Sequence, residues 1–248
     1  MNKPKVIVIC GPTASGKTAL SIELAKKIDG EIISCDSMQI YKDMNIGTAK
    51  VTESEMQGIK HYLVDFVSPD TRYSVADYKI DAEKAIENII SKGKIPIIVG
   101  GTGLYVDSLI YGIEYPEIKF DEEYRKKLEK EADEEGLENL YNKAKEIDEQ
   151  AMQKISINDR KRIIRVLEIY HATGKNKTEQ EIESRKKEVK YDYKIFAINM
   201  DREKLYERIN IRVDKMIENG LIQEVENLQK KYKHFPTAMQ GLGYKEVV

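Results

Sequence analysis

Residues 5–18 read Lys-Val-Ile-Val-Ile-Cys-Gly-Pro-Thr-Ala-Ser-Gly-Lys-Thr, and this stretch decides the fold of the 248-residue chain. Its first part, Lys5 to Cys10, is a short continuous apolar run that is typical of a strand buried in a parallel sheet. Its second part, Gly11 to Thr18, matches the pattern G-x-x-x-x-G-K-[ST], and a stretch with helical periodicity follows up to Gly30. A strand, a glycine-rich loop and a helix in this order predict a loop that binds phosphate groups.

The chemistry of this loop suits a diphosphate or a triphosphate. Its glycines let the backbone close around phosphate oxygens, so that successive N–H groups point inward, and the following helix adds its positive end. Lys17 neutralises the terminal phosphate, and the Thr18 hydroxyl can hold Mg²⁺. The pattern alone does not distinguish ATP from another diphosphate.

The rest of the chain predicts an α/β fold of the P-loop NTPase-like kind, in which helices flank a parallel sheet. Further strands are predicted at 31–36, 61–65, 94–99 and 193–200. Helices of the same core are predicted at 74–91, 201–219 and about 221–231. Ser74 and Asp77 can form a capping box at the start of the first of these helices, and Asp201 is the expected N-cap of the second.

The composition changes between these core segments. From Glu117 to Glu149 the chain has 13 acidic and 7 basic residues, whereas from Arg160 to Lys190 it has 10 basic and 5 acidic residues. Both stretches have helical periodicity and little strand character. We therefore expect an α-helical insertion domain at 119–190 and a catalytic core formed by 1–118 and 191–248.

The overall charge excludes one class of nucleic-acid-binding protein. With a formal net charge of -2, the chain is not a generally basic nucleic-acid coat, so any nucleic-acid binding must come from a local patch. No apolar run approaches the roughly 18 residues of a membrane span, and none resembles a signal peptide. We expect a cytoplasmic protein without a membrane partner, with free thiols at Cys10 and Cys35.

The second predicted strand ends at Asp36. Because the carboxyl ends of parallel strands border the ligand crevice of an open α/β sheet, Asp36 should face the phosphate loop. A carboxylate there can hold Mg²⁺, accept a proton from an attacking amine, or serve only as the N-cap of a turn. The strand at 94–99 ends in Gly-Gly-Thr-Gly rather than in an Asp, which argues against a motor ATPase but leaves a small-molecule kinase open.

Four further motifs follow the phosphate loop: Asp-Ser-Met-Gln-Ile-Tyr at 36–41, Gly-Thr-Ala-Lys at 47–50, Gly-Gly-Thr-Gly-Leu-Tyr at 100–105 and Met-Gln-Gly-Leu-Gly-Tyr-Lys-Glu at 239–246. Together with the loop, this set resembles the tRNA dimethylallyltransferase family, also called tRNA isopentenylpyrophosphate transferases, over essentially the whole chain. The resemblance implies transfer of a dimethylallyl group from dimethylallyl diphosphate to N6 of the adenine immediately 3′ of the anticodon in tRNA, with release of diphosphate.

The resemblance also implies roles for the matching residues. Asp36 would be the general base, with Thr102 and Lys17 completing the catalytic set. The diphosphate would be held by Gly11, Thr13, Ala14, Ser15, Gly16, Lys17 and Thr18, with Mg²⁺ on Thr18. The adenine, which must be extruded from the anticodon loop to react, would contact Asp36, Ser37, Met38, Gln39 and Thr102.

Two arginines on the predicted helix at 201–219 are further candidates for the diphosphate site. Arg208 and Arg212 are four residues apart, so they lie on one face of a helix and can reach the same ligand. Pairing with Glu207 or Glu218 at the surface is the alternative interpretation.

A basic segment opens the helix predicted from Asn158 to about Ala172. Lys161, Arg162 and Arg165 crowd one side of it, which suits an RNA backbone, although a solvated helix face is the alternative. Its buried stripe is predicted to contain Ile163, Val166, Leu167 and Tyr170. The resembled family has two arginines three apart that contact tRNA, and these match Arg162 and Arg165. Lys161 and Arg125 are the remaining candidates for tRNA binding.

The chain ends at Val248, soon after the last motif, whereas the resembled family continues for several more helices. We therefore expect a C-terminally truncated core, and a monomer. Two other functions stay open, a P-loop kinase that acts on a small molecule and a prenyltransferase that acts on free adenine nucleotides. A non-catalytic RNA-binding protein would not require Lys17, Thr18 and Asp36 together.

Overall fold

The computed structural model describes residues 3–115, 121–186, 188–241 and 243–248. The chain divides into two compact units, a core unit of 1–110 with 189–248 and a helical unit of 111–188. The predicted boundary between residues 118 and 119 lies outside the described residues.

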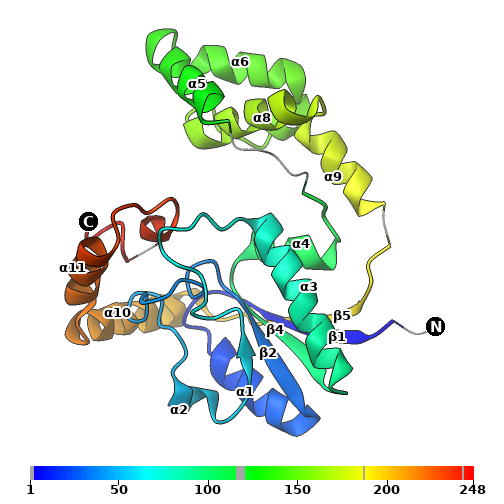
Figure 1. The fold of residues 1–248 in the computed structure, drawn as a ribbon, viewed down its shortest axis with the longest axis vertical. Coiled ribbons are helices and arrows are strands. Elements are labelled where there is room, and N and C mark those ends of the chain that lie inside the picture. Colours follow the sequence, from blue (N-terminus) through cyan, green and yellow to red (C-terminus); the bar gives the residue numbers. More distant parts are fainter. Residues whose placement is uncertain (1–2, 116–120, 187, 242) are drawn as a thin grey trace. The chain divides into compact units, whose positions relative to one another are not determined.

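The core unit contains a five-stranded sheet with the strand order β3-β2-β4-β1-β5, and every pair of neighbours is parallel (Figure 1). Its strands are β1 Lys5–Cys10, β2 Gly30–Cys35, β3 His61–Tyr62, β4 Ile95–Gly100 and β5 Asp192–Ala197. The predicted parallel α/β sheet is confirmed. Its helices are α1 Lys17–Ile28, α2 Glu53–Met56, α3 Val75–Ser91, α4 Gly103–Ile110, α10 Arg202–Glu218 and α11 Leu221–Lys231, followed by the short 3₁₀ helix Ala238–Gln240.

Apolar side chains of the central strands point alternately to the two faces of the sheet and form a hydrophobic layer on each face. Ile97 of β4 faces α1 and packs in one cluster with Ile22. Its neighbour Ile98 faces α3 and α4 and packs in another cluster with Tyr78 and Leu109. Successive residues of a strand point to opposite faces, so a continuous apolar strand such as β4 is buried on both sides.

Local signals place several helix ends. The Ser74 side chain accepts from the backbone N–H of Asp77, whose carboxylate accepts from the backbone N–H of Ser74, so the predicted capping box is confirmed. Asp201 caps α10 as predicted. The predicted strand at 61–65 is wrong beyond Tyr62, because Leu63 and Asp65 have positive φ angles of 58° and therefore leave the extended conformation.

The register brings the ends of three strands together. Cys10 of β1 and Cys35 of β2 both pair with Gly100 of β4. The loops that follow these strands are the phosphate loop, the segment beginning at Asp36, and the Gly101–Thr102 turn. They therefore leave the sheet at one edge, where ligands of open parallel sheets bind.

The helical unit contains α5 Glu122–Glu134, α6 Leu137–Ile147, α7 Glu149–Met152, α8 Arg160–Thr173 and α9 Lys177–Arg185. Its core packs Leu128 of α5 and Leu140 of α6 against Ile163 and Leu167 of α8. Tyr170 is 44% exposed, so the predicted stripe was wrong at this position. Ile164 and Ile169 are buried instead, which shifts the apolar face of α8.

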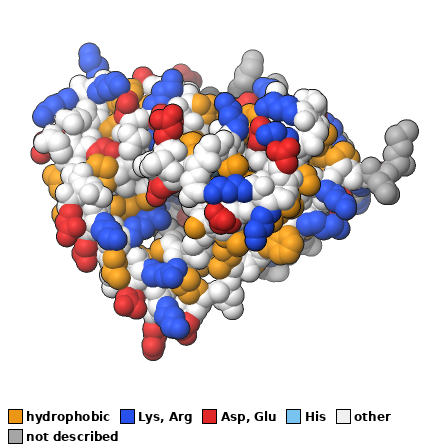
Figure 2. All heavy atoms as spheres, turned by 90° about the horizontal axis from the view of Figure 1, so that it is seen from below, with side chains coloured by type: hydrophobic (Ala, Val, Ile, Leu, Met, Phe, Trp, Pro, Cys, Tyr) orange, Lys and Arg blue, Asp and Glu red, His pale blue; other side chains and the backbone are white. Residues whose placement is uncertain are grey.

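Basic side chains do not form a continuous surface on the face drawn in Figure 2. Lysine and arginine side chains alternate there with acidic and hydrophobic ones, as the net charge of -2 leads one to expect. Among the described residues, no helix is both long enough and apolar enough to cross a membrane.

Candidate active site

The phosphate loop joins β1 to α1. Gly16 precedes the helix with a φ of 90°, and no side chain caps the first turn. Because the first N–H groups of a helix have no partner within the helix, an uncapped first turn beside a loop is suited to hold an anion. The Lys17 ammonium donates to the carbonyls of Gly11 (2.9 Å) and Pro12 (2.6 Å), and these bonds hold it over the loop.

Three charged groups lie near this loop. Burial lowers the pKa of Lys17 from its ordinary value, the Asp36 carboxylate opposes this effect, and the Arg212 guanidinium adds to it. Burial also lowers the pKa of Arg212, and Asp36 again opposes the effect. Lys17 and Arg212 are both partly buried, and Asp36 is the carboxylate that acts on both of them, so these three groups together carry a net positive charge. A diphosphate would supply the negative charge that balances it.

Asp36 follows β2 and begins a turn. Its Oδ1 accepts hydrogen bonds from the backbone N–H groups of Met38 (2.8 Å) and Gln39 (3.2 Å). Oδ2 has no hydrogen-bond partner in the described part of the chain. The two alternative roles, cap and base, therefore require different oxygens: Oδ1 caps the turn and orients the carboxyl group, and Oδ2 remains open to a ligand.

Thr102 lies beside this turn. Its Oγ1 accepts from the backbone N–H of Ser37 (3.0 Å), and the same hydroxyl donates weakly to the Ser37 hydroxyl (3.4 Å). The preceding glycines make this approach possible, because a Cβ on Gly100 would lie 2.0 Å from the Cys35 carbonyl oxygen. A Cβ on Gly101 would lie 3.2 Å from the Gly11 carbonyl oxygen.

Arg208 and Arg212 extend from α10 to the same region. Arg208 donates to the carbonyl of Ala14 in the phosphate loop (3.4 Å), and Arg212 donates to the carbonyl of Thr48 (3.2 Å). Within the described ranges neither forms an ion pair with an acidic residue, and this includes Glu207 and Glu218. Both arginines are therefore available to an anion at the loop.

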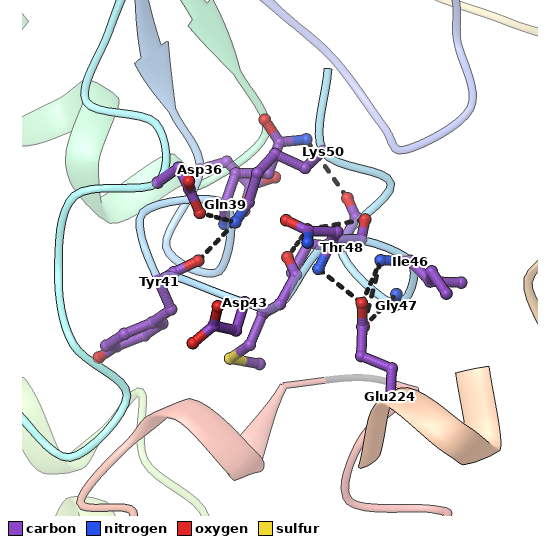
Figure 3. Close-up of polar contacts among 12 residues, drawn as sticks. Asp36, Gln39, Tyr41, Asp43, Ile46, Gly47, Thr48, Lys50 and Glu224 are labelled. Carbon is purple, nitrogen blue, oxygen red and sulfur yellow. Dashed lines mark hydrogen bonds and ion pairs between the residues drawn. The ribbon is translucent and has the colours of Figure 1, made fainter. Parts of the chain in front are cut away.

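Sequence reasoning missed a hydrogen-bond network that includes Gln39, Thr48 and Glu224 (Figure 3). The Gln39 side-chain amide donates to the carbonyls of Thr48 and Ala49, both at 3.3 Å. Glu224 of α11 accepts from backbone N–H groups of the segment 45–47. The Gly47–Lys50 motif was a signal that could have found Thr48. Nothing in the sequence distinguished Glu224.

The donors that could hold a metal ion are few. The described residues contain no group of three or more His, Cys, Asp or Glu side chains that could bind one. Thr18 is exposed in the first turn of α1. A hydroxyl of this kind fits Mg²⁺, which in proteins keeps several waters and takes its other ligands from one or two side chains and from substrate phosphates.

The basic candidates of the helical unit differ in their contacts. Arg125 and Arg165 both donate to the carboxylate of Glu168, at 3.0 and 3.2 Å. Glu168 is only 6% exposed. Arg162 forms an ion pair with Asp159 (3.3 Å) while its side chain remains 70% exposed, and Lys161 is exposed. The structure thus keeps these four residues in the helical unit and gathers the other candidates in the core unit.

Comparison with known proteins identifies the family of the chain. The model of the family described as IPP transferase matches residues 39–248. A tRNA dimethylallyltransferase of Acetivibrio thermocellus is 57% identical over 244 residues, which cover 98% of this chain and 78% of that protein.

Two solved structures are similar over almost the whole chain. The full-length tRNA isopentenylpyrophosphate transferase of Bacillus halodurans is 41% identical with a TM-score of 0.69, and the match covers 99% of this chain and 76% of that one. A eukaryotic dimethylallyltransferase acting on tRNA is 35% identical with a TM-score of 0.77, and the match covers 98% and 60%. This chain therefore belongs to the IPP transferase family, whose named relatives here are tRNA dimethylallyltransferases.

Proposed function

We propose that this chain transfers a dimethylallyl group from dimethylallyl diphosphate to N6 of the adenine immediately 3′ of the anticodon in tRNA. Family membership supports the type of reaction. The observation that carries the proposal is the hydrogen bonding of the Asp36 carboxylate, whose Oδ1 accepts from two backbone N–H groups while its Oδ2 has no hydrogen-bond partner among the described residues. The Asp36 carboxylate also lies within the electrostatic reach of Lys17 and Arg212.

The phosphate loop and two arginines hold the diphosphate in this proposal. Backbone N–H groups of the loop and the positive end of α1 face the anion. Its ligands are Gly11, Thr13, Ala14, Ser15, Gly16, Lys17, Thr18, Arg208 and Arg212. These groups stabilise the negative charge that develops on the diphosphate as the allylic carbon–oxygen bond breaks, and the bonding electrons leave with the diphosphate.

Asp36 acts on the other reactant. The exocyclic amine of adenine is a poor nucleophile because its lone pair is delocalised into the ring. As the nitrogen–carbon bond forms, one N6 proton passes to Asp36 Oδ2, which prevents positive charge from building up on the nitrogen. Thr102 holds the turn that carries Asp36, and Ser37, Met38 and Gln39 contact the extruded base.

Mg²⁺ is the expected metal, with Thr18 as its protein ligand. When bound, it would neutralise part of the charge of the diphosphate.

The helical unit supplies the tRNA contacts in this proposal. Arg125, Lys161, Arg162 and Arg165 bind the phosphate backbone of the anticodon stem-loop, since a basic cluster in a chain of net charge -2 provides a local attraction for RNA. A substrate of this kind also leads us to propose a monomeric enzyme that works in the cytoplasm.

The experiment that tests the reaction uses labelled dimethylallyl diphosphate, Mg²⁺ and unmodified tRNA with an adenine 3′ of the anticodon. We expect label on tRNA and none on free AMP offered in a parallel reaction. Label on AMP instead would favour a prenyltransferase of free nucleotides, and no transfer to either acceptor would contradict the proposed reaction.

The role of Asp36 needs a variant and a matched control. Asp36→Asn keeps the shape of the side chain but removes the proton acceptor, so transfer should fall by roughly 10²-fold or more while tRNA affinity stays within a few-fold. Asp70→Asn, at an exposed position, should leave both unchanged. Undiminished turnover in Asp36→Asn would remove Asp36 from the role of base.

A further inference from the structure

We infer that Glu224 is a positioning residue, which holds Arg212 and Gln39 at the active site through the backbone of residues 45–48. The inference rests on the proposed diphosphate site and extends it to a residue that makes no contact with the proposed reactants. Glu224 lies in the first turn of α11.

The Glu224 carboxylate binds three successive backbone N–H groups (Figure 3). Its Oε2 accepts from Asn45 at 2.9 Å and from Ile46 at 2.8 Å, and its Oε1 accepts from Gly47 at 3.2 Å. Consecutive N–H groups that converge in this way form an anion-binding concavity. Hydrogen bonds to a charged acceptor are the stronger kind, so this carboxylate fixes the local backbone.

Tyr244, from the last motif, completes the arrangement. Its hydroxyl donates to Glu224 Oε1 at 2.5 Å. Its ring packs so closely on Gly47 that a Cβ there would lie 2.5 Å from a ring carbon and 2.9 Å from a methyl carbon of Leu221. The motifs at 47–50 and 239–246, to which the proposed reaction gives no role, thus meet at Glu224.

The held segment reaches the active site through one carbonyl group. The carbonyl oxygen of Thr48 accepts from the guanidinium of Arg212 (3.2 Å) and from the side-chain amide of Gln39 (3.3 Å). The backbone N–H of Gln39 in turn donates to Asp36 Oδ1 (3.2 Å). Two hydrogen bonds, joined by the backbone between Gly47 and Thr48, therefore connect Glu224 to Arg212. Three hydrogen bonds connect Glu224 to Asp36 by way of Gln39.

The chemistry of Glu224 makes the inference testable with a small change. In Glu224→Gln, one of the two oxygens becomes an NH₂ group. That group is a donor only, and it faces backbone N–H groups that are also donors. The segment 45–48 should shift, and with it the Thr48 carbonyl that orients Arg212.

The experiment measures the affinity of the chain for inorganic diphosphate with Mg²⁺ by titration calorimetry. We expect Glu224→Gln to weaken binding about tenfold, which corresponds to ~1.4 kcal/mol. Arg212→Gln should weaken it at least as much. If Glu224 acts through Arg212, the double variant should bind no more weakly than Arg212→Gln alone, because effects within one network are not additive.

Glu226→Gln is the matched control. Glu226 lies on the same helix, and its contacts are surface ones with Gln223 and Lys230, so its substitution should leave the affinity for diphosphate unchanged. Tyr244→Phe is the milder variant if Glu224→Gln fails to fold. It removes one bond to the carboxylate and keeps the ring, and we expect about threefold weaker binding, a fraction of the full loss.

Three results would overturn the inference: unchanged affinity in the Glu224→Gln and Tyr244→Phe variants, losses that multiply in the double variant, and a wild-type chain that does not bind diphosphate. The measurement is independent of prenyl transfer. A wild-type chain that binds diphosphate but transfers no label contradicts the proposed reaction, whereas the comparison among variants still decides the role of Glu224.

Discussion

The backbone N–H of Ser37 donates a 3.0 Å hydrogen bond to the hydroxyl oxygen of Thr102. This bond joins the loop after β2 to the loop after β4, although the two residues are 65 positions apart in sequence. It therefore fixes where the Asp36 carboxylate lies relative to the end of β4.

Thr102→Val should slow prenyl transfer, because valine keeps the volume of the side chain but removes the acceptor for Ser37. A partly buried N–H that loses its partner costs ~1–3 kcal/mol, so we expect kcat to fall by roughly 10- to 100-fold. Initial rates at saturating concentrations of both substrates measure this effect.

Thr102→Ser is the control for that change, since it keeps the hydroxyl and should retain most of the wild-type rate. Equal rates for the valine and serine variants would show that the bond to Ser37 does not matter for turnover.

Gly100→Ala should destabilise the core unit. The added Cβ would lie 2.0 Å from the Cys35 carbonyl oxygen and 2.4 Å from its carbonyl carbon, and backbone atoms in the middle of a sheet cannot move aside easily. We expect the free energy of unfolding to fall by about 2 kcal/mol or more, seen as a lower midpoint in denaturant. Gly103→Ala, where an added Cβ meets nothing within 4 Å, should leave the midpoint almost unchanged. If both variants unfold at the same denaturant midpoint, the result would contradict the close contact between Gly100 of β4 and Cys35 of β2.

The parts of this site that the sequence predicts are those encoded locally. A strand, a phosphate loop and a helix are contiguous in 5–28, and the position of Asp36 follows from its place at the end of a buried strand. Helix ends were predictable for the same reason, since the Ser74 and Asp201 caps depend on neighbouring residues.

The parts that were not predictable depend on contacts between distant segments. Glu224 binds backbone N–H groups 177–179 residues away, and backbone groups leave no trace in the residue types at positions 45–47. The spacing of apolar residues predicts that Tyr170 lies on the buried face of α8. The packing of α5 and α6 decides which face is buried, and it includes Ile164 rather than Tyr170.

Glu31, at the start of β2, should make the free energy of unfolding depend on pH in the acidic range. Burial alone would raise the pKa of this carboxyl, but hydrogen bonds from Tyr62, Lys92 and Lys94 outweigh it and lower the pKa below its ordinary value. A lowered pKa in the folded state contributes stability that is complete above the pKa of the unfolded chain and is lost as the pH falls through the folded value.

Urea unfolding of the wild type and of Glu31→Gln tests this effect. We expect the wild type to be the more stable at pH 7, and the difference should shrink as the pH is lowered from about 5 to 3. Glu87→Gln, which changes an exposed pair with Lys190, should show little difference at either pH. A gap between the wild type and Glu31→Gln that stays constant over this range would contradict the lowered pKa.

Arg162→Ala combined with Arg165→Ala should weaken tRNA binding and reduce its dependence on salt. Each arginine that neutralises a phosphate releases counterions, so removal of two should lower the slope of log affinity against log salt by roughly one to two units. Binding measured at several salt concentrations gives this slope directly.

Lys126→Ala combined with Lys130→Ala is the matched control, because these exposed lysines also lie in the helical unit and pair with Glu122 and Glu134. Loss of Arg165 also removes one of the ion pairs of the buried Glu168 and leaves its pair with Arg125, so the melting temperature must be compared at the same time. A slope that stays at the wild-type value in a folded double variant would exclude these two arginines from the tRNA interface.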